Sequence, residues 1–344
     1  DYVKVREQHA SKKGVKLVSL EAARANATKI AWQDYSPPKP AFLGVRELKN
    51  FPIEQLVPYI DWSPFFQTWD LWGKYPQILD DAVVGESARE VFANAQKMLD
   101  KIIKGKWLQA NAVFGFWPAN RAVASVDSVD VYADAASRAK VLQSFHHLRQ
   151  QNEKPSGNPN QCLADFIAPI GTCDYLGGFA VTTGIGCAER AKAFEAANDD
   201  YSAIMLKALA DRLAEAFAEY LHARVRRDDW GYAKDETLDT DDLTAEKYRG
   251  IRPAPGYPAC PEHSEKAPLF QLLDATGAVK RAGISLTDAY AMWPTAAVSG
   301  FFYSHPQSQY FAVGKIDHDQ VMDYAGRKGW SIPMAERWLA PNIG

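Results

Sequence analysis

Cysteine is scarce in this chain of 344 residues, which holds only Cys162, Cys173, Cys187 and Cys260. No two of them form a CxxC pair, so a disulfide scaffold is excluded. We interpret the four as reduced thiols, buried as small apolar side chains. This use of cysteine predicts a cytoplasmic protein.

Long apolar runs and an excess of one charge are also missing. No run of 18 apolar residues occurs and the first 30 residues are charged and mixed, which argues against a membrane-spanning helix and a secretory signal. Lys plus Arg number 39 against 42 Asp plus Glu, and this net charge of −3 gives no basic field for nucleic acid or an acidic membrane. Because the chain begins with Asp1 and not Met, we expect a piece of a longer protein.

The common catalytic signatures are absent as well. The sequence contains no GxSxG, no GxGxxG after a strand, no Walker loop and no HExxH. No two segments read as a nucleophile with its base. If the chain is an enzyme domain, we expect chemistry that needs no acid–base pair of its own.

What the chain does contain is typical of a globular protein, with 47% hydrophobic, 24% charged and 12% aromatic residues. Residues 1–40 look like a helical linker from an upstream module. Helical stretches are expected at Tyr2–Lys12 and Leu20–Ala31, the second capped by Ser19, before a proline cluster stops any helix. We expect residues 41–344 to form one large domain.

Apolar spacing predicts several helices in that domain. Ser87 and Glu90 resemble a capping box ahead of apolar residues 91–103 at helical spacing. Asp200–Arg227 carries an apolar stripe beside a polar one that includes Asp211, Glu215 and Glu219. Two further helices are expected at about Asp319–Lys328 and Pro333–Leu339.

Strands are expected between these helices, at Asn111–Pro118, Val129–Tyr132, Val141–Leu148, Phe179–Thr183, Ser299–Ser304 and Tyr310–Ile316. The second and third would pair as a hairpin, although Asp134–Lys140 between them is equally consistent with the start of a helix. Because strands do not alternate regularly with helices, we expect an α+β fold, a twisted antiparallel sheet flanked by helices.

The segment Arg252–Pro261 has the strongest features of a ligand-binding loop. Four prolines, at positions 253, 255, 258 and 261, hold the backbone extended and rigid. Arg252 suits a carboxylate, Gly256 allows a turn or a close approach, and Tyr257 offers a ring and a hydroxyl. The combination suits a small planar ligand with a carboxylate, and a structural proline-rich loop is the alternative.

A second candidate is Asp61, which stands among Trp62, Phe65, Phe66, Trp69 and Trp72. A carboxylate in apolar surroundings needs a cationic partner, so Asp61 is a candidate for holding a ligand ammonium. The alternative is an Asp that caps the turn before Ser63-Pro64.

Two further clusters predict no site. Cys260, Glu262 and His263 are too close together to ligate one metal ion easily, so we expect no metal. On a strand, His146 and His147 would point to opposite faces, and a structural role is expected for them.

Together these segments resemble the C-terminal activation domain of cobalamin-dependent methionine synthase. The resemblance covers about residue 40 to the C-terminus and rests on motifs in the same order: Ile60–Phe66, His146–Gln151, Ala208–Tyr220 (ALADRLAEAFAEY), Arg252–His263 (RPAPGYPACPEH) and Trp338–Asn342.

This resemblance implies a methyltransferase that moves a methyl group from methyltetrahydrofolate to homocysteine in methionine biosynthesis. The activation domain would bind S-adenosylmethionine as methyl donor for the reductive methylation of cob(II)alamin. Cobalamin would be bound by an upstream module of the same chain, and flavodoxin or a related flavoprotein would supply the electron. Zinc is implied only for the full-length enzyme, and no nucleic acid or membrane partner is implied.

The implied ligand-binding residues are Asp61, Asp211, Glu215, Glu246, Arg252, Ala254, Gly256, Tyr257, Tyr310 and Phe311. Phe311 departs from the family, which commonly has tyrosine there, so a side-chain hydrogen bond is in doubt. Glu215 and Asp211 are also consistent with a solvated helix face. No catalytic residue is expected because positioning dominates this methyl transfer, and Tyr257 is the candidate that faces the cobalamin. The alternatives are a flavoprotein-docking module that binds no small molecule and a free-standing enzyme with an unrecognised site.

Overall fold

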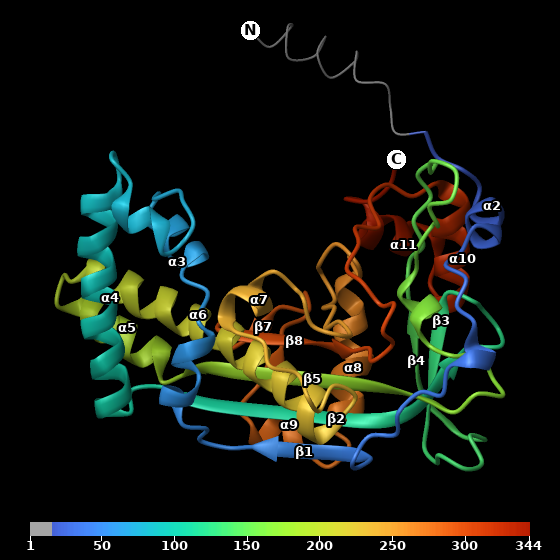
Figure 1. Cartoon of the computed structure of the whole chain (residues 1–344), viewed down its shortest axis with the longest axis horizontal. Helices are drawn as coiled ribbons and strands as arrows, with labels where there is room; N and C mark the ends of the chain where they lie inside the picture. Colours follow the sequence, from blue (N-terminus) through green and yellow to red (C-terminus); the bar gives the residue numbers. More distant parts are fainter. Residues whose placement is uncertain (1–15) are drawn as a thin grey trace, which may run out of the picture.

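The computed structural model describes residues 16–344 and is built around a six-stranded sheet in which every pairing is antiparallel (Figure 1). The strand order is β4-β3-β2-β5-β8, and β1 pairs with β2 ahead of β3 along the same edge. The strands are β1 Gly44–Leu48, β2 Gln109–Arg121, β3 Ser128–Tyr132, β4 Val141–His146, β5 Asp174–Ile185 and β8 Ala297–Phe302. A small hairpin joins β6 Ser285–Leu286 to β7 Met292–Trp293.

The helices lie around this sheet, which confirms the expected α+β fold. Their bounds are α2 Leu20–Ala25, α3 Ser63–Gln67, α4 Gly85–Gly105, α5 Cys187–Ala196, α6 Asp200–Arg224, α7 Thr240–Thr244, α8 Lys266–Leu273, α9 Ala278–Arg281, α10 His318–Lys328 and α11 Ile332–Leu339. Apart from the span 2–12, which lies outside the described residues, every predicted helix is present with shifted ends. Among residues 16–344, none of the helices is both long and apolar enough to cross a lipid bilayer.

Both faces of the central strands are buried, and alternate residues serve different cores. Phe114 and Phe116 of β2 pack in the core under α6, whereas Val113 and Trp117 pack in the core that contains α8 and α9. This alternation follows from the two-residue period of a strand. The sheet is therefore the middle layer of three, which explains the long apolar stretches in its sequence.

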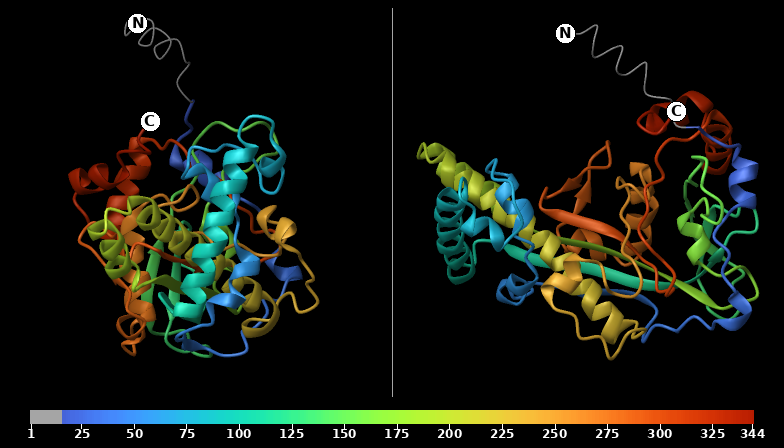
Figure 2. Two further views of the ribbon diagram at one scale, coloured as in Figure 1. Left: turned by 90° about the vertical axis from the view of Figure 1, so that its left-hand side faces the viewer. Right: turned by 45° about the horizontal axis from the view of Figure 1, so that its top comes forward.

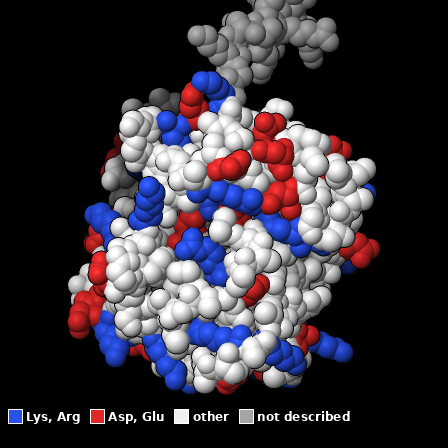
Figure 3. Space-filling model, turned by 90° about the vertical axis from the view of Figure 1, so that its right-hand side faces the viewer, with Lys and Arg blue, Asp and Glu red and all other residues white. Residues whose placement is uncertain are grey.

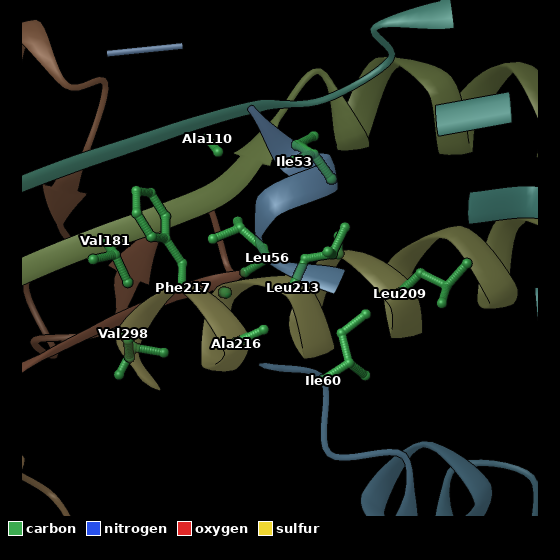
Figure 4. Packing of buried hydrophobic residues seen from close by; sticks show 14 of the residues in the cluster. Ile53, Leu56, Ile60, Ala110, Val181, Leu209, Leu213, Ala216, Phe217 and Val298 are labelled. Carbon is green, nitrogen blue, oxygen red and sulfur yellow. The ribbon is translucent and has the colours of Figure 1, made fainter. Parts of the chain in front are cut away.

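Helix α6 crosses one face of the sheet, as the views of Figure 2 show. The predicted stripe of Met205, Leu209, Leu213, Phe217 and Leu221 is fully buried. Figure 4 shows Leu213 and Phe217 between the strands and the segment of residues 53–60. The polar stripe of α6 is left facing away from this core, where it borders the candidate site.

The capping-box prediction at Ser87 and Glu90 is wrong. Helix α4 begins at Gly85, and its N-cap position, Val84, makes no side-chain cap. Asp81 stabilises this entry, because its Oδ1 accepts the amides of Val83 and Val84 at 2.8 and 2.9 Å. The first turn is thus already organised before Ser87 is reached.

The strand predicted at Tyr310–Ile316 is also wrong, because that segment is extended but joins no sheet. Its neighbour is the proline-rich loop, whose prolines lack the amide donors that a ladder requires. Val313 donates its amide to the Pro258 carbonyl, and Ile316 forms only an isolated bridge with Ile343. The other uncertain segment, Asp134–Lys140, forms turns and no helix, as the hairpin prediction requires.

Residues 16–40 pack against the body of the domain. Ser19 caps α2 as predicted, accepting the amide of Ala22, and the helix ends at Ala25. Arg24 of α2 forms ion pairs with Asp127 at 2.7 Å and Asp323 at 2.9 Å. On the face of the molecule that carries α2 and α10, acidic and basic side chains lie side by side (Figure 3).

Candidate functional site

Two adjoining cavities lie between the polar stripe of α6 and the loops that follow it. One has a volume of about 180 Å³ and the other about 440 Å³. Glu215, Glu246, Tyr248 and Arg252 line both, so the two cavities form a single site with two compartments. The predicted loop at Arg252–Pro261 supplies one wall of the larger compartment.

The smaller compartment is strongly polar. Its ionisable lining residues are Asp61, Glu215, Glu219 and Glu246 on one side of the balance and Arg212 and Arg252 on the other. Four carboxylates against two guanidinium groups leave an excess of two negative charges when all are ionised. Such a compartment suits a ligand with more positive than negative charge.

The larger compartment is more apolar. Its walls come from the backbone and side chains of residues 253–259, from Val298 at the start of β8, and from Tyr310 and Phe311. Tyr257 stands at its rim with 58% of its surface exposed. A planar, mostly apolar group fits such a space, with backbone groups of the loop available for hydrogen bonds.

Arg252 already has a protein partner in this structure. Its Nη2 donates to Glu219 Oε2 at 2.7 Å, while its Nε is buried without a hydrogen-bond partner among the described residues. Burial disfavours the guanidinium charge, but the adjacent Glu219 carboxylate holds the pKa of Arg252 above its usual value. Arg252 therefore stays charged and keeps donors for a carboxylate, as predicted.

Asp61 satisfies both of its predicted roles. Its Oδ1 accepts the Ser63 amide at 2.9 Å, which caps the turn before Pro64, and its side chain also lines the polar compartment. The aromatic surroundings predicted for it are wrong. Trp62, Phe65 and Phe66 are buried in the core beside α6, and Trp72 is 70% exposed.

Gly256 makes the turn that the sequence predicts, with φ of +97°. Its close neighbour, however, is the ring of His263 and not the cavity, since a β-carbon on Gly256 would lie 2.4 Å from His263 Cε1. Gly256 thus shapes the loop from behind. Ala254, two residues earlier, lines the larger compartment directly.

The two acidic residues singled out on α6 differ in placement. Glu215 lines both compartments, and burial raises the pKa of its carboxyl above the usual value against the opposing effect of Arg252. Asp211 lines neither compartment, has a side chain 56% exposed, and pairs with Arg212. Burial likewise raises the pKa of Glu246, whose backbone adopts a φ of +55° at the edge of the site.

Tyr310 and Phe311 both line the larger compartment. The Tyr310 hydroxyl accepts the Arg252 amide at 2.9 Å and lies 3.2 Å from the Tyr248 hydroxyl. Phe311 contributes only its ring, so the doubt about a side-chain hydrogen bond at this position is justified.

The sequence interpretation missed four lining residues: Tyr59, Arg212, Glu219 and Tyr248. Glu219 had a detectable signal, because it lies four residues after Glu215 on the same polar stripe and hence on the same helix face. The roles of Tyr59 and Tyr248 depend on loops far apart in sequence, and no local pattern indicates them.

The remaining polar clusters are structural. The buried His147 bonds the Tyr303 hydroxyl at 3.0 Å, and His146 bonds Ser128 at 2.9 Å. Glu262 accepts the Ser264 amide and the Tyr324 hydroxyl. Among residues 16–344, no group of three or more His, Cys, Asp or Glu side chains is arranged to hold a metal ion.

Comparison with known proteins agrees with this geometry. Residues 52–329 match the family model of the vitamin B12 dependent methionine synthase activation domain. The chain is also similar to a crystal structure of the MetH reactivation domain bound to AdoHcy, with a TM-score of 0.90 and 55% sequence identity. That match covers 95% of this chain and 99% of the other.

Proposed function

The chain belongs to the family of vitamin B12-dependent methionine synthase activation domains, and we propose that its two-compartment site binds S-adenosylmethionine. The family membership confirms the resemblance inferred from the motifs. The proposal concerns the ligand, the orientation of that ligand and the residues that hold it.

The polar compartment suits the amino-acid end of the ligand. S-adenosylmethionine carries an α-carboxylate, an α-ammonium and a sulfonium, so its net charge is positive. Arg252 suits the carboxylate, because guanidinium and carboxylate can share parallel hydrogen bonds. Asp61 suits the ammonium, and the excess of acidic groups including Glu215 and Glu246 suits the sulfonium.

The larger compartment suits the adenosine end. Its volume of about 440 Å³ and its mostly apolar walls can enclose a purine. Ala254 and the backbone that follows it run along this wall, where amide and carbonyl groups can bond the edge of the base. The observation that carries the proposal is this junction: an arginine and an acidic compartment joined to an apolar one lined by a rigid loop.

The chain's own contribution to methyl transfer would be binding and orientation. Cobalamin, bound by an upstream module of the same protein, supplies the metal centre that accepts the methyl group. Tyr257 is exposed at the rim of the site and would face that module on docking. No residue here needs to move a proton, because an in-line displacement from a sulfonium has a good leaving group and depends on alignment.

The remaining features of the function are proposed with the same ligand in view. Flavodoxin or a related flavoprotein would supply the electron, and zinc would belong only to the full-length enzyme. Residues 1–40 would connect the upstream module to the domain. A cytoplasmic location is proposed because all four cysteines are unpaired. The isolated chain would bind its ligand but not turn over without the cobalamin module.

A calorimetric titration of the chain with S-adenosylmethionine tests the proposal. We expect saturable binding that is weakened by Arg252→Ala and by Asp61→Ala. Glu195→Gln is the control, since Glu195 forms an ion pair with Lys207 on a half-exposed surface and lines neither compartment. A titration without heat, together with no melting shift at excess ligand, would overturn the proposal.

The competing function is a flavoprotein-docking module that binds no small molecule. The paired compartments argue against it, because a docking surface does not require an enclosed space with a buried guanidinium. The failed titration described above would favour this alternative. Turnover of a small substrate by the isolated chain would instead favour a free-standing enzyme.

A further inference from the structure

Arg252 is carried by an irregular loop, yet a residue of the long helix α6 holds its side chain. Glu219 accepts the 2.7 Å hydrogen bond from Arg252 Nη2, and the two side chains are only 13% and 20% exposed. An arginine side chain has about 2 kcal/mol of rotamer entropy, so a loop-borne guanidinium without a partner would sample several orientations. Glu219 gives it a fixed point on a 25-residue helix.

Glu219 is itself held from behind. Arg226 lies two helical turns further along, fully buried, with its Nη1 4.0 Å from Glu219 Oε1. Arg226 in turn donates through Nε to Glu236 at 2.7 Å, and its guanidinium lies 4.5 Å from the centre of the Tyr248 ring. The charges therefore alternate from Arg252 through Glu219 and Arg226 to Glu236.

The backbone of Arg252 is fixed separately from its side chain. Its amide donates to the Tyr310 hydroxyl, and the hydroxyl of Tyr248 lies beside that of Tyr310. Guanidinium has five N–H donors, and only one of those of Arg252 is engaged by Glu219. Arg252 Nε is buried without a hydrogen-bond partner among the described residues. Both ends of Arg252 are thus anchored while most of its donors stay available.

We infer that Glu219 is a positioning residue, which orients Arg252 toward the ligand carboxylate and so makes the site selective for ligands with an amino-acid end. This inference rests on the proposed function, because it needs an adenosyl ligand in the larger compartment. An ion pair that served only the fold would affect all ligands of the site alike. Dependence on the ligand's carboxylate is therefore the property that separates the two roles.

The test compares two ligands that share the adenosyl thioether. S-adenosylhomocysteine carries the amino acid, and 5′-methylthioadenosine lacks it. In calorimetric titrations, Glu219→Gln should weaken S-adenosylhomocysteine binding about tenfold, the scale of a lost charged hydrogen bond, and change methylthioadenosine binding less than about twofold. Glu195→Gln, the surface control, should change neither. Equal weakening of both ligands, or of neither, would overturn the inference.

Two further measurements cover a Glu219→Gln variant that folds poorly. Glu219→Asp keeps the charge but withdraws the carboxylate by one methylene, and the same ligand-selective loss is expected. In an Arg252→Ala background, replacing Glu219 should cause no further loss of S-adenosylhomocysteine affinity, because its effect acts through Arg252. If the wild-type chain binds neither ligand, the proposed function itself fails. Wild-type binding without a ligand-selective loss refutes the role of Glu219 alone.

Discussion

Gly256 lies against the imidazole of His263, so closely that a β-carbon at position 256 would come within 2.4 Å of the ring. The two residues belong to one loop, in which Gly256 donates its amide to the Cys260 carbonyl at 2.7 Å. This contact, combined with a φ of +97°, makes glycine the residue that lets the proline-rich loop fold back behind the site.

Gly256→Ala should therefore destabilise the chain by about 1–3 kcal/mol, the scale of backbone strain at such a position. The free energy of unfolding, measured in urea with and without S-adenosylmethionine, checks this. A double variant, Gly256→Ala with His263→Ala, removes the contact but not the strained φ, and should recover only part of the loss. Full recovery would show that the contact alone requires glycine.

Asp61 has two roles that substitution can separate. Asp61→Asn keeps an oxygen that can accept the Ser63 amide but removes the charge, so we expect weaker binding of S-adenosylmethionine with little change in unfolding free energy. Asp61→Ala should lose the binding and also about 1 kcal/mol of stability, as for a lost helix cap. Titrations and urea unfolding of both variants distinguish the roles. Unchanged affinity in the Asn variant would leave Asp61 as a turn-capping residue only.

The acidic lining predicts how binding depends on pH. Burial raises the pKa of Glu215 and of Glu246, so both carboxyls gain protons at a higher pH than usual. A bound cation favours their ionised forms, so its binding releases protons, and affinity should fall as pH drops through these raised pKa values. The limit is about tenfold per pH unit for each carboxyl.

Comparing ligands at pH 7.5 and 5.5 checks this dependence. The affinity for S-adenosylmethionine should fall more than that for S-adenosylhomocysteine, which lacks the sulfonium charge. A Glu215→Gln, Glu246→Gln double variant should bind the sulfonium ligand less tightly at pH 7.5 and show a flatter profile. A profile as steep as that of the wild type would exclude these carboxyls as its cause.

Local patterns in the sequence were enough for much of the fold. The four-residue spacing from Met205 to Leu221 predicted α6 and its buried face correctly. Failures occurred where a distant segment decided the outcome. The stretch after Tyr310 has the composition of a strand, but its neighbour, the loop containing Pro258, cannot complete a ladder.

The candidate site divides in the same way. Arg252 and Tyr257 stand in a segment whose prolines and glycine mark it as unusual, and the structure places both at the cavities. Glu219 became a candidate only through its contact with Arg252, 33 residues later in the chain. Nothing in the local sequence of α6 indicates which of its acidic residues meets that loop.

Histidine burial predicts a loss of stability in acid. Burial lowers the pKa of His147 to about 3, whereas the unfolded chain binds that proton near its ordinary pKa of about 6.5. The unfolded state thus binds more protons between these values, and the contribution of His147 to stability is lost as pH falls below about 6.5. His147→Gln should therefore be most destabilising at pH 7.5, and the gap to wild type should narrow toward pH 5. Urea unfolding at several pH values measures the gap, and a constant gap would contradict a neutral buried imidazole.

Asp174 should show the opposite dependence, which makes it the matched test of this sign. Burial raises its pKa to about 7, against the hydrogen bonds it accepts from the amides of Ala168 and Tyr175 at 2.8 Å. Here the folded state holds the extra proton, so the wild type gains stability as pH falls from about 7 toward the ordinary aspartate pKa of about 4. Asp174→Asn cannot take up that proton, and its destabilisation relative to wild type should grow from pH 8 to pH 5 by up to about 1.4 kcal/mol per pH unit. Because the His147→Gln gap should shrink over part of the same range, a general acid effect on folding cannot produce both results, and parallel changes in the two variants would refute these assignments.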